Sequence, residues 1–147
     1  MHKITYRRLL SEDDKEIPQL ISIYQLPEIK RYISISDNYF HYVTSNETVC
    51  FYKVYACNRM IGAIHIEKRG VVLFMDILVF PEFQGKGLGT KILKDIQNDV
   101  FGLDFERIDV SIDEENTASL RLFQNAGFLP TSKEDELINF VYRKEVV

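Results

Sequence analysis

The sequence has few of the residues that mark disulfide frameworks and metal centres. Cysteine occurs twice, at Cys50 and Cys57, with no CxxC pair, and the three histidines are dispersed. A structural zinc site needs about four converging ligands, and small secreted domains are stapled by several cysteine pairs. We therefore expect two reduced thiols, no metal ligand and no metal cofactor.

Long apolar runs and an excess of basic charge are also absent. No stretch approaches the roughly 18 apolar residues of a membrane helix, and residues 1–16 lack the apolar core and cleavage site of a signal peptide. Acidic residues outnumber basic ones by 22 to 18, a formal net charge of -4. Phosphate-rich partners usually select a basic face. These features predict a cytoplasmic protein without a membrane or nucleic-acid partner.

No linker, repeat or low-complexity segment divides the chain, so we predict one domain over residues 1–147. Hydrophobic periodicity predicts strands at 4–10, 49–56, 60–67, 71–80, 105–112 and 137–146. It predicts helices at 88–100 and 116–125 and a first helix that starts at Ser11 and is interrupted by Pro27. Residues 28–45 are expected to form one or two short helices. This order is typical of an α/β (α+β) fold with a mixed sheet that helices cover.

The run VVLFMDILVF at 71–80 is apolar except for Asp76. A strand that is buried on both faces has this pattern, so we place it at the centre of the sheet. Desolvation should raise the pKa of Asp76 toward the range of a general base. The alternative is a structural carboxylate that bonds neighbouring groups. Glu67, at the end of the preceding strand, is the second candidate base.

A glycine-rich loop, Gln84–Thr90, joins this strand to the next helix and contains three of the seven glycines. Alternate glycines allow left-handed backbone angles that turn N–H groups inward, and the helix N-terminus adds positive potential. The spacing fits neither the dinucleotide fingerprint, which needs glycine at Thr90, nor the P-loop. Lys86, Lys91 and Lys94 add positive charge. The loop therefore predicts a site for a different phosphate-containing ligand.

Two segments resemble motifs of the GNAT N-acetyltransferase superfamily. FPEFQGKGLGTKIL is similar to the acetyl-CoA signature (Q/R)xxGx(G/A), with Gln84, Gly87 and Gly89 at the defining positions. ENTASLRLFQNAGF is similar to the later motif NxxSxxLYxxxGF and follows at the usual distance. The resemblance implies a GNAT-like acyl-CoA N-acyltransferase fold. That fold has a central, mostly antiparallel sheet with a splayed parallel strand pair and helices on both faces.

The same resemblance implies that acetyl-CoA lies in the wedge between strands 71–80 and 105–112. Backbone groups near Leu78 and Val79 would pair with pantetheine, and the Val79 N–H would meet the oxyanion. The loop amides would hold the pyrophosphate. Asn116 would bind the pantetheine arm or the adjacent backbone from the opposite wall. The implied cofactor-binding residues are Leu78, Val79, Gln84, Gly85, Lys86, Gly87, Leu88, Gly89, Thr90, Asn116, Ser119 and Phe123.

The chain departs from the family pattern at Phe123, where a tyrosine is expected. Phenylalanine has no proton to give to the departing thiolate. Three explanations stay open: the thiolate leaves without a dedicated acid, Tyr142 or Ser119 supplies the proton, or the protein binds acyl-CoA without efficient transfer. Since thiol pKa values lie near about 8.5, the loss of the acid should slow the step rather than abolish it.

We predict transfer of an acetyl group from acetyl-CoA to a primary amine of a small molecule or protein, in a ternary complex, by a monomer or homodimer. A cluster of four tyrosines at 24, 32, 39 and 42 either forms an aromatic acceptor pocket or packs in the core. One alternative is a non-catalytic acyl-CoA-binding module, which Phe123 motivates. Another is a ribosome- or tRNA-directed acetyltransferase, which the net charge disfavours.

Overall fold

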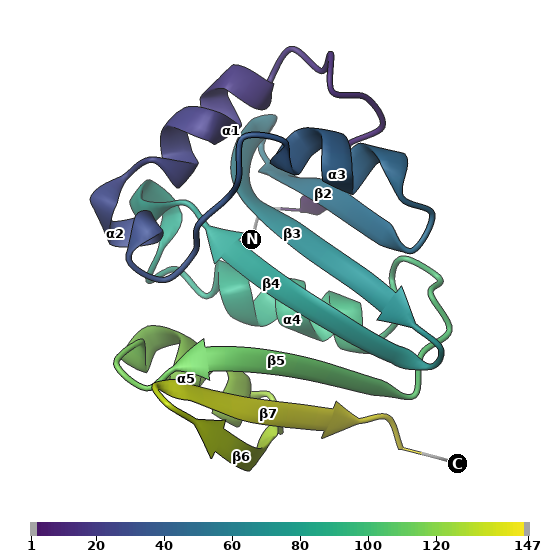
Figure 1. The fold of residues 1–147 in the computed structure, drawn as a ribbon, viewed down its shortest axis with the longest axis vertical. Coiled ribbons are helices and arrows are strands. Elements are labelled where there is room, and N and C mark those ends of the chain that lie inside the picture. Colours follow the sequence, from purple (N-terminus) through teal and green to yellow (C-terminus); the bar gives the residue numbers. More distant parts are fainter. Residues whose placement is uncertain (1–2, 146–147) are drawn as a thin grey trace.

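A seven-stranded sheet in the order β1-β2-β3-β4-β5-β7-β6 forms the centre of the computed structural model, which describes residues 3–145 (Figure 1). The strands are β1 (Ile4–Arg8), β2 (Val49–Ala56), β3 (Arg59–Arg69), β4 (Val72–Val79), β5 (Arg107–Asp113), β6 (Leu129–Glu134) and β7 (Leu137–Arg143). The helices are α1 (Ile17–Tyr24), α2 (Pro27–Lys30), α3 (Tyr39–Ser45), α4 (Leu88–Gln97) and α5 (Thr117–Asn125), with a 3-10 turn, η1 (Pro81–Phe83). The mixed sheet is confirmed, and the predicted element order is found apart from one missing strand.

Several predicted boundaries were wrong, and one strand was missed. Helix α1 begins at Ile17 rather than after Ser11. Strand β6 was not predicted, because its six residues are all exposed and show no alternation of apolar and polar side chains. Helix α4 ends at Gln97 rather than at Val100, because Asp99 adopts a positive φ of 56°. The Asp99 carboxylate also accepts hydrogen bonds from the following backbone, which fixes the turn. The last strand ends at Arg143, and Val146 lies outside the described residues.

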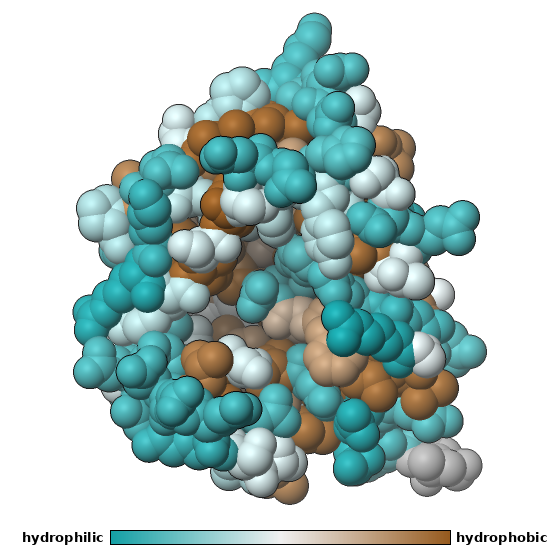
Figure 2. Space-filling model, in the orientation of Figure 1, coloured by the Kyte–Doolittle hydropathy of each residue, from teal (hydrophilic) through white to brown (hydrophobic). Residues whose placement is uncertain are grey.

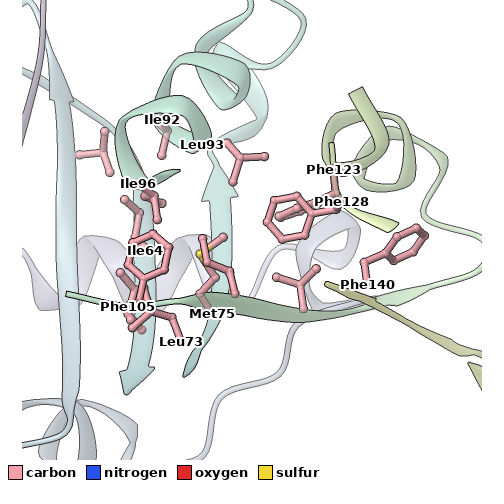
Figure 3. Packing of buried hydrophobic residues seen from close by; sticks show 14 of the residues in the cluster. Ile64, Leu73, Met75, Ile92, Leu93, Ile96, Phe105, Phe123, Phe128 and Phe140 are labelled. Atoms are coloured by element: carbon pink, nitrogen blue, oxygen red, sulfur yellow. The ribbon is translucent and has the colours of Figure 1, made fainter. Parts of the chain in front are cut away.

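Helices cover both faces of the sheet and divide the core into two clusters. Helices α1, α2 and α3 pack on one face, while α4 and α5 pack on the other. Figure 3 shows Ile92, Leu93 and Ile96 of α4 lying over Leu73 and Met75 of β4. Alternate side chains of β4 point to opposite faces, so Asp76 points toward the α1–α3 side. None of the helices within residues 3–145 is long and apolar enough to cross a bilayer.

Strands β4 and β5 are parallel and pair over three residues, Val72–Phe74 against Arg107–Asp109. Beyond this point β4 continues along β3 as far as Val79, and β5 continues along β7 as far as Asp113. The two strands therefore diverge, as the gap between their ribbons in Figure 1 shows. The predicted splayed parallel pair is confirmed.

A partly buried charge cluster ties the segment before α1 to strand β2. The ammonium group of buried Lys53 donates to Asp14 Oδ2 at 2.7 Å and to Glu16 Oε1 at 2.9 Å, and the Tyr55 hydroxyl donates to Glu16. Burial alone would raise the pKa of each carboxyl, but the hydrogen bonds from Lys53 and Tyr55 hold both pKa values below the usual range. Burial alone would lower the pKa of Lys53, and its carboxylate partners raise it instead.

This cluster predicts a pH-dependent loss of stability in Lys53→Met, which leaves two carboxylates without their shared cation. At pH 7 we expect the free energy of unfolding in urea to fall by about 2–3 kcal/mol. Carboxyl groups with depressed pKa values stabilise the fold above their unfolded pKa, near about 4, and lose that contribution as the pH falls through the folded pKa. The difference between wild type and Lys53→Met should therefore shrink below about pH 4.

Lys133→Met is the matched control, because Lys133 pairs with Glu114 and both side chains are more than a third exposed. Its cost should stay below about 1 kcal/mol. An equal cost for the two variants, or a difference for Lys53→Met that is the same at pH 3 and pH 7, would contradict the assignment.

Candidate functional site

A cavity of about 360 Å³ lies against the end of β4, beyond the point where β5 has parted from it. Its walls come from the end of β4, the η1–α4 loop, the start of α5 and the α2 segment. Figure 2 shows the surface hollowed in this region, with apolar atoms at its depth. Ten of the twelve predicted cofactor-binding residues line this cavity: Leu78, Val79, Gln84, Gly85, Gly87, Leu88, Gly89, Thr90, Asn116 and Ser119.

The alternation of hydrogen bonds along β4 fixes which backbone groups face the gap. Phe80 donates its N–H to β3, at Ile61, whereas Val71 accepts from the residues that begin β5. Because bonding direction alternates along a strand, the even-numbered residues bond β3 and the odd-numbered residues face β5. The N–H and C=O groups of Val79 are thus directed into the gap. Those of Leu78 point to β3, so Leu78 contributes its side chain to the cavity wall.

The glycine loop opens the N-terminus of α4 toward the same cavity. Gly85 and Gly87 have φ values of 77° and 78°, angles that side-chain-bearing residues rarely adopt. Gly87 precedes the helix and has no side chain to cap it, and the first turn contains no acidic residue. The amides of Leu88, Gly89 and Thr90 therefore have no partner within the helix. This arrangement suits a phosphate group.

Gln84 has a contact that the sequence did not reveal. Its side-chain Nε2 donates to the carbonyl oxygen of Val79 at 2.9 Å. The bond attaches the loop to the end of β4 and occupies the carbonyl that faces the gap. The Val79 N–H, which points the same way, is the group left to face a ligand.

Asn116 and Ser119 build the opposite wall. The Asn116 Oδ1 accepts a hydrogen bond from the Ser119 N–H at 3.3 Å and so caps α5. Gly89 allows α4 to approach α5, since a Cβ there would lie 3.3 Å from the Leu122 side chain. The loop and the second motif, which are far apart in sequence, are brought together as predicted.

Lys86 and Phe123 are the two predicted binding residues that do not line the cavity. The Lys86 ammonium lies 5.9 Å from the ring centroid of Phe83. Phe123 is 5% exposed and packs edge-to-face on Phe128 in the core. Its ring belongs to the α4–α5 side of the sheet, so it supports the site from behind.

Tyr142, a predicted proton donor, lies away from Asp76. It is opposite Ile108 in the β5–β7 pair, and its ring stacks at 5.4 Å on Phe128. These contacts place Tyr142 on the α4–α5 face, whereas Asp76 points to the α1–α3 face. The structure therefore does not bring the two predicted catalytic residues together. Of the two hydroxyls considered for the acid, that of Ser119 lies on a residue of the cavity wall.

Asp76 faces a second cavity, of about 210 Å³, which shares Ile33 and Leu78 with the first. Asp76 is exposed to solvent through this open cavity although many protein atoms lie near it, so the prediction that β4 is buried on both faces was wrong for this side of the strand. No described residue forms a hydrogen bond or ion pair with its carboxylate. Burial raises the pKa of Asp76, nearby Glu67 adds to the rise, and His65 opposes it. The predicted direction of the pKa shift is the one found.

Aromatic and imidazole side chains complete the second cavity. Tyr24 and Tyr39 come from α1 and α3, and His65 lies opposite Asp76 in the β3–β4 pair. His65 was not among the predicted site residues, although its spacing of two from Glu67 places both on one face of a strand. Glu67 Oε1 accepts a hydrogen bond from the Tyr42 hydroxyl and lies within hydrogen-bond distance of His65 Nε2. Burial alone would raise the pKa of Glu67, but these partners hold it below its usual value.

No group of three or more histidine, cysteine, aspartate or glutamate side chains within residues 3–145 is placed to hold a metal ion.

A model of the Acetyltransferase (GNAT) family matches residues 12–128. A search of curated protein sequences finds no match. Solved structures share the fold at low identity. A domain from Methanocaldococcus jannaschii is 17% identical with a TM-score of 0.83, covering 97% of this chain and 99% of that chain. Campylobacter jejuni N-acetyltransferase PseH in complex with acetyl coenzyme A is 13% identical with a TM-score of 0.79, covering 97% and 100%.

Spermidine N-acetyltransferase from Vibrio cholerae, in complex with CoA and spermine, is 14% identical with a TM-score of 0.79, covering 96% of this chain and 95% of that one. The family match spans most of the chain, including both motifs, and the structural matches extend the shared fold to nearly all of it. The chain belongs to the GNAT acetyltransferase family.

Proposed function

We propose that the protein is an N-acetyltransferase that transfers the acetyl group of acetyl-CoA to a small primary amine in a ternary complex. The observation that carries the proposal is the pair of adjoining cavities. One has an uncapped helix N-terminus and a free strand edge, and the other has an unpaired carboxylate between aromatic rings. The cavities meet at Ile33 and Leu78, which is where two substrates could react.

The residues of the larger cavity fit the parts of acetyl-CoA. The free amides of Leu88, Gly89 and Thr90 would bind the pyrophosphate, and the gap-facing edge of β4 at Ile77, before Val79, would pair with the pantetheine arm. The bound thioester supplies the activated acetyl group. Among the solved structures with this fold, PseH is in complex with acetyl coenzyme A, and the spermidine enzyme is in complex with CoA and spermine.

The smaller cavity fits an amine. Asp76 would attract the ammonium form of the acceptor, and the rings of Tyr24 and Tyr39 add a cation–π surface. After the ammonium loses one proton, its nitrogen forms a bond to the acetyl carbon. As the carbon–sulfur bond breaks, the nitrogen gives its second proton to solvent and keeps one in the amide. The Val79 N–H would donate to the oxyanion between these events. The thiolate then takes a proton from solvent or from the Ser119 hydroxyl.

A non-catalytic acyl-CoA-binding module is the second candidate, and Phe123 is the observation that favours it. A buried phenyl ring cannot protonate the leaving thiolate. Both candidates predict acetyl-CoA binding, and turnover with an amine separates them.

Calorimetry should first show micromolar binding of acetyl-CoA and no comparable binding of NAD or ATP. Thr90→Asp places a carboxylate in the first turn of α4, where it should repel the pyrophosphate and weaken acetyl-CoA binding by at least about tenfold. Because an acid at this position favours the helix dipole, the melting temperature should not fall.

Thr90→Asn, of similar size but uncharged, is the control and should bind acetyl-CoA within about threefold of wild type. Equal affinities for Thr90→Asp and Thr90→Asn would mean that the phosphates bind elsewhere. If the folded wild-type protein does not bind acetyl-CoA, both candidate functions fail.

Thiol release from acetyl-CoA tests turnover, with a panel of compact and extended primary amines as acceptors. An acceptor should raise thiol release above the hydrolytic background, and Asp76→Asn should reduce kcat/KM by at least about tenfold because the ammonium loses its counter-charge. Asp76→Asn should bind acetyl-CoA normally, since Asp76 does not line the larger cavity. Tight acetyl-CoA binding with no stimulation by any amine would favour the non-catalytic module.

A further inference from the structure

A chain of hydrogen bonds leads from the smaller cavity to the protein surface. The Tyr39 hydroxyl lies 2.6 Å from Nδ1 of His65, and Nε2 of His65 lies 3.1 Å from Oε1 of Glu67. The three residues come from α3 and from one face of β3, and Tyr39 and His65 both line the cavity that Asp76 faces. A single neutral tautomer satisfies both contacts: Tyr39 donates to an unprotonated Nδ1, and the Nε2–H donates to Glu67.

The groups around His65 leave Glu67 able to accept the Nε2–H and would stabilise a positive charge on the ring. Glu67 also accepts from the Tyr42 hydroxyl at 2.7 Å and from Arg69 at 3.3 Å, and these donors keep it ionised. Asp76 is the cross-strand neighbour of His65, so an imidazolium there would lie between two carboxylates. The Tyr24 ring lies 6.1 Å from that of Tyr39, between ring centroids, and the Tyr24 oxygen is a competing acceptor for the Tyr39 hydroxyl.

We propose that Tyr39, His65 and Glu67 form the proton acceptor for the amine, with Asp76 as the group that binds the ammonium. This inference rests on the proposed function. The ammonium gives a proton to Tyr39 Oη while the Tyr39 hydroxyl proton passes to His65 Nδ1. The resulting imidazolium is stabilised by the Glu67 carboxylate and returns its proton to solvent before the next turnover. The bonds broken and formed balance without a further reactant.

The order of groups is that of a base oriented by a carboxylate. Tyr39 acts as a relay rather than as a stable phenolate, because burial and the nearby anionic groups raise its pKa well above the usual value. Asp76 has no hydrogen-bonded route of this kind, since no described side chain bonds its carboxylate. The geometry therefore separates two tasks, attraction of the cation and acceptance of its proton.

Nuclear magnetic resonance can test the chain without any substrate. Long-range ¹H–¹⁵N spectra of histidine-labelled protein should show His65 as the Nε2–H tautomer above neutral pH, with the signal assigned by its loss in His65→Gln. Tyr39→Phe should shift the Nδ1 resonance, and Glu67→Gln should shift Nε2. A His65 that carries its proton on Nδ1 would overturn the proposal, whatever the protein acetylates.

The pH dependence of kcat and KM provides the functional test, with the best acceptor of the amine panel as the probe. In wild type, kcat/KM should rise with pH to a plateau, with one break that belongs to the proton acceptor. In His65→Gln and Tyr39→Phe, kcat at pH 7 should fall by about 10²-fold or more and recover as the pH approaches the pKa of the free amine. Asp76→Asn should raise KM for the amine and leave the pH of the break unchanged.

His41→Gln is the matched control, because His41 lies exposed on the same helix as Tyr39 and contacts Glu12. It should match wild type at every pH. Normal acetyl-CoA affinity in all variants would show that they fold. A pH break that moves in Asp76→Asn but not in His65→Gln would assign the base to Asp76 and overturn the proposal. If no amine is accepted, the proposed function fails, and the tautomer spectra still decide the hydrogen-bond chain.

Discussion

The parting of β4 from β5 after three paired residues is the constraint on which the site depends. A strand pair in mid-sheet normally satisfies its backbone groups by pairing, and unpaired groups there are costly unless a ligand or solvent reaches them. The separation leaves the gap-facing edge of β4 free near Val79 and makes room for a cavity. The glycine loop and α5 then close two sides of that cavity, because Gly89 lets the two helices approach. The proposed cofactor site thus consists mostly of backbone groups, which depend little on side-chain identity.

The two-residue period of β4 assigns separate tasks to its two sets of side chains. The side chains of Leu73 and Met75 pack in the core beneath α4, and the side chain of Asp76 points into the cavity beneath α1 and α3. The antiparallel register then sets His65 beside Asp76, and the same period in β3 places Glu67 next to His65 on that face. The proposed acceptor side is therefore built from side chains, in contrast to the proposed cofactor side, which is built from backbone. If these roles hold, substitutions among the side chains of α1, α3 and β3 would change the acceptor and leave the cofactor site intact.

Much of the cofactor side could be predicted from sequence because its signals are local. The loop Gln84–Thr90 has glycines where positive φ angles are needed, and Asn116 stands where a helix cap is needed. The acceptor side could not be predicted in the same way, since Tyr39 and His65 meet only through the packing of α3 on the sheet. The exposed strand β6 left no hydrophobic pattern to find, and the direction of the Leu78 backbone depends on a pairing register that no local motif reports. The roles assigned to Asp76, Tyr142 and the binding residues stay predictions until they are measured.

The replacement of the expected tyrosine by Phe123 should slow acetyl transfer less than the loss of an acid would suggest. At pH 7, roughly one in 2,500 molecules of an amine with the ordinary lysine pKa is neutral, whereas a thiol with a pKa near about 8.5 is a fair leaving group without help. Removal of the ammonium proton is thus the larger obstacle of the two proton transfers. The chain has no hydroxyl at position 123, where it would serve the thiolate, and has three hydrogen-bonded groups beside the amine cavity. An enzyme with this distribution of groups would assist removal of the ammonium proton, which has the greater free-energy cost, rather than protonation of the thiolate.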